Sequence, residues 1–190
     1  MRASSDFVTI SQLTSDGSRP VESQIIGALF PPLPAYLNGL VQDRHPEAKE
    51  QVASVVSALL GWAAKPERVL LVGPIGSGKI AMMHGAAKFA EAYCIRIQVT
   101  ADMFASDLDR MFAQADQHER VLIIIDHSGS YHSQCRYSHI DSRVAQHLDR
   151  LSGRRNTVVV ISTNDAANLN KDLQDRFGDF KIDMTPASAI

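Results

Sequence analysis

Short apolar segments alternate with longer amphipathic segments along most of the chain. Runs rich in Val, Leu and Ile have the length and continuity of strands buried on both faces. Such strands, alternating with helices, predict a parallel sheet with helices on both sides. The five predicted strands lie at residues 68–72, 94–99, 121–125, 157–161 and 180–182.

Helical periodicity follows most of these runs. Helices are predicted at residues 79–93, 106–118, 143–151 and 170–177. An earlier helix is predicted to open at His45 and Pro46, because proline suits the first turn and apolar residues then recur at three- and four-residue spacing. Residues 1–20 are polar and are expected to form a flexible segment, followed by one α/β domain over residues 21–190.

The overall composition excludes several classes of protein. The chain is 45% hydrophobic and 21% charged with a net charge of −2, which is an ordinary globular balance. Without a basic excess, no nucleic-acid partner is expected, and no apolar run approaches membrane-spanning length. Cys94 and Cys135 are too few for a disulfide framework, so an intracellular and by default cytoplasmic location is expected.

A glycine-rich turn follows the first predicted strand and leads through a lysine into a helix. Glycine lets backbone N–H groups turn towards a phosphate, and the helix adds the positive end of its dipole. An ordinary glycine-proline turn is the alternative, but the spacing and context favour a phosphate-binding loop. The expected nucleotide-binding residues are Gly73, Pro74, Ile75, Gly76, Ser77, Gly78, Lys79 and Ile80.

Asp126 closes the strand predicted at 121–125, where a carboxylate can hold Mg²⁺ through water beside the phosphates. The loop pattern, however, ends in Ser or Thr, whose hydroxyl binds Mg²⁺, and here that residue is Ile80. An aliphatic side chain cannot coordinate a hard cation. We therefore expect ATP or ADP as the ligand and weakened binding of Mg²⁺.

Four segments, in order, resemble the AAA family of ATPases, and the resemblance extends from about residue 25 to residue 186. The first segment, LLVGPIGSGK, resembles the Walker A motif. Another, VLIIID, resembles the Walker B motif. A third segment, SDLDRMFAQA, resembles the family's helix between these two motifs. The last, VVVISTNDAANLNKDLQDRF, resembles the sensor-1 strand and the arginine-finger segment. The resemblance implies a three-layer P-loop fold with a five-stranded parallel sheet of order 5-1-4-3-2, and a homo- or hetero-oligomer of AAA subunits acting on a protein substrate.

The same resemblance assigns roles to single residues. Asn164 would position the attacking water, and Arg176 would be the finger that reaches a neighbour's γ-phosphate, unless it is a solvated surface arginine. His127 stands where the family has the glutamate that activates water, so it is either a substitute base or a polar residue at a strand end. Losing a general base typically costs about 10²–10⁴ in rate.

Some assignments stay open at this stage. Met103 and Phe104 either serve as a short pore loop or belong to the core, and residues 24–27 match the family's adenine-side segment weakly. The family's helical lid has no counterpart, as expected for an excised fragment or for a naturally reduced protein. A zinc site is a rival hypothesis without a recognised spacing, and Cys135 lacks a nucleophile motif. The zinc-ligand types in question are His127, His132, Cys135 and His139.

Two functions therefore compete. One is a nucleotide-binding subunit of a ring or complex with little hydrolysis of its own, which the Ile80 and His127 departures favour. The other is an active AAA ATPase that remodels or unfolds proteins. A small-molecule kinase is a weaker third hypothesis, because the chain shows no acceptor-substrate motif.

Overall fold

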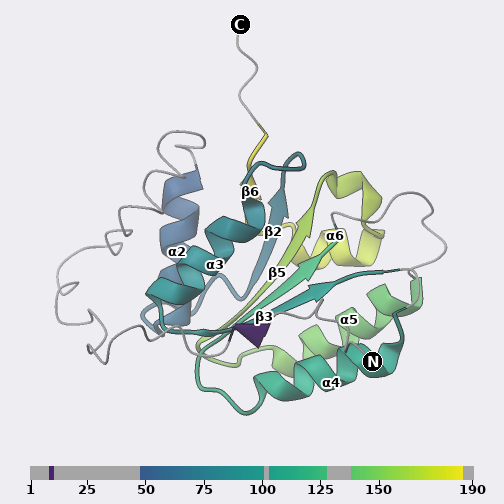
Figure 1. The fold of residues 1–190 in the computed structure, drawn as a ribbon, viewed down its shortest axis with the longest axis horizontal. Helices are drawn as coiled ribbons and strands as arrows, with labels where there is room; N and C mark the ends of the chain where they lie inside the picture. The colour runs from purple at the N-terminus through teal and green to yellow at the C-terminus, as the bar shows by residue number, and fades with distance from the viewer. Residues whose placement is uncertain (1–8, 11–47, 101–102, 128–137, 186–190) are drawn as a thin grey trace, which may run out of the picture.

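The computed structural model describes residues 9–10, 48–100, 103–127 and 138–185. Its centre is a six-stranded sheet of order β1-β3-β4-β5-β2-β6 (Figure 1). The strands are β1 (Thr9–Ile10), β2 (Arg68–Val72), β3 (Tyr93–Gln98), β4 (Val121–Asp126), β5 (Thr157–Thr163) and β6 (Lys181–Asp183). Strands β2 to β6 pair in parallel and, numbered from β2, have the order 5-1-4-3-2, which confirms the predicted fold class.

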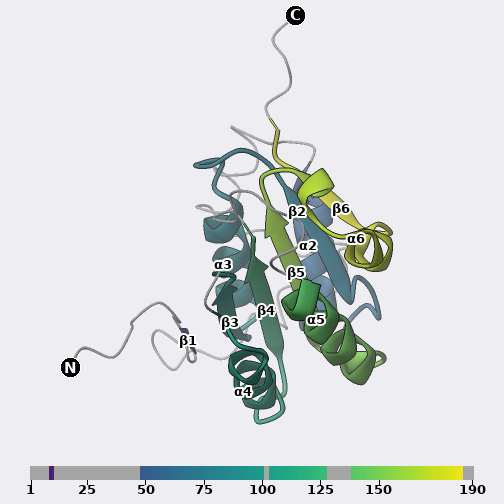
Figure 2. The same cartoon turned by 90° about the vertical axis from the view of Figure 1, so that its right-hand side faces the viewer.

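Helices cover both faces of this sheet and complete the three layers (Figures 1 and 2). On one face lie α2 (Lys49–Leu59) and α3 (Lys79–Phe89), and on the other lie α4 (Ala105–Ala115), α5 (Ser138–Leu151) and α6 (Lys171–Phe177). A short 3₁₀ helix, η3 (Ala166–Asn168), links β5 to α6. Each face has its own core, here called the α2/α3 core and the α4/α5/α6 core.

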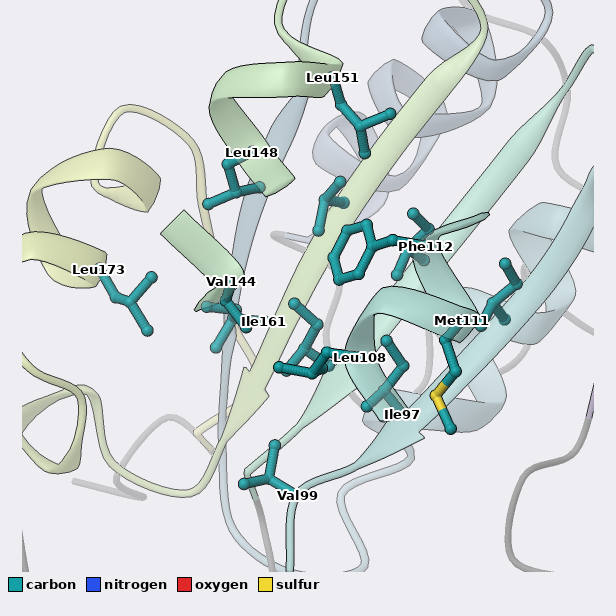
Figure 3. Packing of buried hydrophobic residues seen from close by; sticks show 14 of the residues in the cluster. Ile97, Val99, Leu108, Met111, Phe112, Val144, Leu148, Leu151, Ile161 and Leu173 are labelled. Atoms are coloured by element: carbon teal, nitrogen blue, oxygen red, sulfur yellow. The ribbon is translucent and has the colours of Figure 1, made fainter. Parts of the chain in front are cut away.

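Strand β4 divides the two cores. All six of its residues are buried, with Leu122 and Ile124 in the α2/α3 core and Ile123 and Ile125 in the other. This alternation is the two-residue period of a strand, and it explains the continuous apolar run in the sequence. Figure 3 shows the second core, in which side chains of α4 and α5 pack over the sheet.

The ends of several elements differ from their predicted positions. The helix predicted at 79–93 ends at Phe89, and the chain turns through Glu91, which has a φ of 49°, before β3 begins at Tyr93. Helix α5 begins at Ser138, five residues before the predicted start at 143, because its first turn is polar and carries little apolar periodicity. The early helix is described from Lys49, and the predicted opening at His45 and Pro46 lies outside the described residues.

Strand β1 was not predicted from the sequence. Thr9 and Ile10 pair antiparallel with Ile95 and Cys94, at the edge of the sheet formed by β3. Two residues are too few to show a strand period within a polar segment. The rest of residues 1–20 lies outside the described residues, so the expected flexibility of that segment stays a prediction.

Candidate functional site

The glycine-rich loop, residues 73–78, connects the carboxyl end of β2 to α3. Gly78 has a φ of 89° as the N-cap of α3, a left-handed conformation that favours glycine. A Cβ at Gly73 would lie 2.9–3.0 Å from atoms of Met184, so a side chain there would push the loop away from the end of β6. The local sequence therefore builds the compact strand–loop–helix turn that a phosphate-binding loop requires.

Lys79 is the first residue of α3, and its side chain turns back over the loop. Its Nζ donates to the carbonyls of Gly73 at 2.5 Å and Pro74 at 2.8 Å, and to Oδ1 of Asn164 at 3.2 Å. Burial of Lys79, which is 5% exposed, lowers its pKa, while the charge of Asp126 raises it. The structure thus brings Lys79 and Asn164 together, and a bound phosphate would compete with these oxygens for the ammonium group.

Asp126 lies on the same side of the sheet as α3. Its side chain projects to the same face as Ile124, two residues earlier, which belongs to the α2/α3 core. Its Oδ2 accepts a hydrogen bond from Nη2 of Arg96 on β3, at 2.5 Å. The Asp126 side chain is only 5% exposed, so this charge-assisted hydrogen bond offsets the free-energy cost of burying the carboxylate.

Arg96 was not among the predicted site residues. A signal was present, because an arginine interrupts the apolar pattern of CIRIQV on the strand. Its distance of thirty residues from Asp126 hides the pairing, which becomes visible only once β3 and β4 are known to be neighbours.

The residues present do not fit Mg²⁺ as the Walker pattern requires. Magnesium takes oxygen ligands in a strict octahedral arrangement. Ile80 offers no oxygen and packs against the α2/α3 core, and the carboxylate of Asp126 is engaged by Arg96. A divalent cation at Asp126 would share the carboxylate with the Arg96 guanidinium and would receive no side-chain oxygen from residue 80.

His127 follows Asp126 directly but lies in a different environment. Side chains alternate along an extended chain, so His127 is on the side of the α4/α5/α6 core. Its Nε2 is 3.9 Å from Oδ1 of Asp141 on α5, too far for a hydrogen bond, and the described residues offer it no other hydrogen-bond partner. Burial lowers the pKa of His127 to about 4, although Asp126 raises it. His127 is therefore neutral at pH 7 and a weak base.

Arg176 lies on α6 and is engaged within its own chain. Its guanidinium forms an ion pair with Asp149 of α5, and its Nε donates to both carboxylate oxygens of Asp172 at 3.1 Å. The side chain is only partly exposed. A finger role would require Arg176 to exchange these carboxylates for a phosphate on another subunit.

The two pore-loop candidates separate in the structure. Met103 is buried in the α4/α5/α6 core, which confirms the core alternative for this residue. Phe104 is 71% exposed, just before α4, where its backbone N–H donates to Oδ2 of Asp107 at 3.1 Å. Only Phe104 remains available for a contact with a partner.

The zinc hypothesis is not tested by the structure. His132 and Cys135 lie outside the described residues, as do residues 24–27, and the side chain of His139 is not described. Within the described ranges, no three His, Cys, Asp or Glu side chains form a group that could hold a metal ion.

The fold and this loop together define a P-loop nucleotide-binding domain. A glycine-rich turn joins strand to helix, and Lys79, Asp126 and Asn164 gather at the carboxyl edge of a parallel sheet. The model of the ATPase family associated with various cellular activities (AAA) matches residues 69–184. The chain therefore belongs to the AAA family.

Solved structures of similar fold include the AAA domain of FIGL-1, with a TM-score of 0.61, 19% identity and coverage of 73% of this chain. Another is a chain from a structural study of katanin self-assembly, with a TM-score of 0.58, 18% identity and coverage of 84%. This chain spans 51% and 62% of the length of those two chains. No curated protein shows a significant sequence match. Among the described helices, none is both long and apolar enough to cross a bilayer.

Proposed function

We propose that this chain is a nucleotide-binding AAA subunit with weak or absent ATP hydrolysis of its own, acting within a ring or complex of AAA subunits. The observation that carries the proposal is a contrast within one site. Lys79 and Asn164 lie together over the loop, as nucleotide binding needs, whereas Asp126 is paired with Arg96 and residue 80 is isoleucine. Phosphoryl transfer depends on a metal that neutralises developing charge.

The environment of His127 supports the same proposal. A general base works best with a pKa near the operating pH, and burial holds the pKa of His127 at about 4. The competing function is an active AAA ATPase that remodels or unfolds proteins, and the retention of Asn164 and Arg176 favours it. Phosphate release by the wild-type chain well above background would favour that second function.

Nucleotide binding is tested by Lys79→Ala. We expect the variant to bind ATP and ADP at least tenfold more weakly, because it removes a buried charged donor from the loop. Lys88→Ala, an exposed lysine in the last turn of the same helix, is the matched control and should bind like the wild type. Isothermal titration gives both dissociation constants, and an unchanged value for Lys79→Ala would place the nucleotide elsewhere.

Assembly is tested by Arg176→Ala. We propose that Arg176 contacts a neighbouring subunit, and the self-assembly of a structurally similar katanin chain supports this. Releasing Arg176 from its partly exposed carboxylate partners costs little, since such pairs contribute only about 0–1 kcal/mol. We expect ATP to promote association and Arg176→Ala to weaken it several-fold.

Sedimentation velocity across a protein concentration series, with and without ATP, measures this association. Arg110→Ala is the control, because Arg110 is an exposed arginine of α4 whose ion-pair partner among the described residues is its helix neighbour Asp107. A wild-type chain that stays monomeric with ATP at every concentration would refute the proposed assembly. Equal association of the two variants would refute the role of Arg176.

A further inference from the structure

We propose that the guanidinium of Arg96 replaces Mg²⁺ as the cation beside Asp126, so that this site binds ATP or ADP without a divalent cation. The inference rests on the proposed nucleotide-binding function and adds the residue that takes over from the metal. Four observations support it: the placement of Arg96, the charges that surround it, its buried Nε–H and the nature of residue 80.

The register of the sheet places Arg96 where it can reach Asp126. Arg96 pairs with Ile124 and Gln98 pairs with Asp126 in the parallel ladder between β3 and β4. Arg96 and Asp126 thus point to the same face, the one that contains Cys94 and Ile124 and is covered by α3. The arginine side chain is long enough to bridge this diagonal, as the 2.5 Å contact with Oδ2 demonstrates.

The groups beneath the loop form one electrostatic cluster. The charge of Asp126 acts on Lys79, where it raises the pKa against the effect of burial. Arg96 acts in turn on His84 of α3, whose pKa is lowered first by burial and second by the arginine charge. Arg96 therefore supplies positive charge to the space between α3 and the carboxyl ends of β3 and β4, where the Walker pattern puts the metal.

The guanidinium of Arg96 also has a hydrogen-bond donor available for a further acceptor, such as a phosphate oxygen. Its Nε–H is buried and makes no hydrogen bond to the part of the chain that the structure describes, while the side chain as a whole is 29% exposed. Arginine is permanently charged and its planar fork matches phosphate oxygens, so it can serve an anion in a way that a solvated surface cation cannot.

The presence of Arg96 also accounts for an isoleucine at position 80. In the loop pattern the hydroxyl at residue 80 is a ligand to Mg²⁺, and a cation that is part of the chain needs no such ligand. An aliphatic residue at position 80 can instead pack on the α2/α3 core, as Ile80 does. The absence of a hydroxyl at residue 80 and the presence of an arginine at residue 96 then have the same explanation.

The test measures ATP affinity with excess Mg²⁺ and with EDTA by isothermal titration. For the wild type we expect the two dissociation constants to agree within about threefold. For Arg96→Met we expect Mg²⁺ to strengthen binding by at least about tenfold, mainly because affinity in EDTA falls. Adding Ile80→Thr to Arg96→Met should enlarge this dependence, whereas Ile80→Thr alone should change it little.

Arg68→Met is the matched control. Arg68 is also a half-buried strand arginine, but it begins β2 at the end of the sheet away from the loop, where its Nη2 donates to the carbonyl of Leu148. This variant should keep the wild-type ratio. If Arg96 only ties β3 to β4, Arg96→Met will weaken binding equally in both buffers, and that result overturns the inference.

The wild-type ratio is decisive by itself and does not depend on the folding of any variant. Binding that is about a hundredfold weaker in EDTA than in Mg²⁺ would overturn the replacement of the metal and leave nucleotide binding intact. No binding of ATP or ADP in either buffer would instead overturn the proposed function, and the inference with it.

Discussion

Phe112→Ala is expected to lower the free energy of unfolding by about 3–5 kcal/mol, the usual effect of removing a buried phenylalanine ring. Phe112 is fully buried between α4 and the sheet (Figure 3). Its ring stacks on the imidazole of His147 from α5, with centroids 4.2 Å apart and planes at 2°. The substitution therefore leaves a cavity at the point where α4, α5 and the sheet meet.

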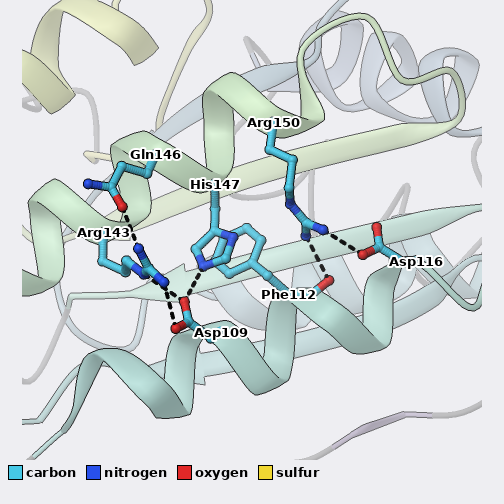
Figure 4. Close-up of polar contacts among 7 residues, drawn as sticks. All are labelled: Asp109, Phe112, Asp116, Arg143, Gln146, His147 and Arg150. Carbon is cyan, nitrogen blue, oxygen red and sulfur yellow. Dashed lines mark hydrogen bonds and ion pairs between the residues drawn. The ribbon is translucent and has the colours of Figure 1, made fainter.

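Polar contacts surround this ring but contribute less. Asp109 accepts hydrogen bonds from Arg143 and His147, and Arg150 pairs with Asp116 and donates to the carbonyl of Phe112 (Figure 4). Partly exposed ion pairs of this kind contribute about 0–1 kcal/mol each. The hydrophobic ring should dominate the stability of this interface.

Urea unfolding of three variants separates the contributions. Asp116→Asn removes the partner of Arg150 and Arg154 without changing the core, and it should cost less than about 1 kcal/mol. Phe112→Leu should lie between Asp116→Asn and Phe112→Ala, because leucine fills part of the cavity. If Phe112→Ala costs no more than Asp116→Asn, then the ion pairs and not the ring hold α4 to α5.

The strands were predicted more accurately than their connections. Residues 68–72 form β2 with the predicted bounds, because a strand buried on both faces leaves a continuous apolar run. The end of α3 was placed four residues too late, since alanines near Glu91 suit a helix equally well and only the backbone turn there breaks it. The strand order followed from the resemblance to a known family and not from periodicity.

In the site, residues at strand ends could be predicted and contacts between strands could not. Lys79 and Asn164 follow a strand in the sequence, so the geometry of a parallel sheet was enough to bring them together. Arg96 needed the register of β3 against β4, and the burial of His127 needed the packing of α5. Both features depend on tertiary contacts, which a local sequence pattern does not contain. The first changes the chemistry expected of Asp126, and the second changes that expected of His127.

Lowering the pH from 7.5 to 4.5 is expected to cost the wild type about 2–3 kcal/mol of unfolding free energy through His127 alone. Burial holds the pKa of His127 at about 4, against an ordinary value near 6.5, although Asp126 opposes this and Asp141 faces the ring at 3.9 Å. Because the unfolded chain binds the proton more readily, stability is complete above about pH 6.5 and falls as the pH drops towards 4.

Urea unfolding of the wild type and of His127→Gln at the two pH values isolates this contribution. Glutamine has no group that titrates in this range, so the variant should lose about 2–3 kcal/mol less than the wild type. Other titrating groups, including the half-buried His84 and His147, act on both proteins and cancel in the difference. Equal losses would mean that His127 keeps an ordinary pKa. It would then be an effective base at neutral pH, which would favour an active ATPase.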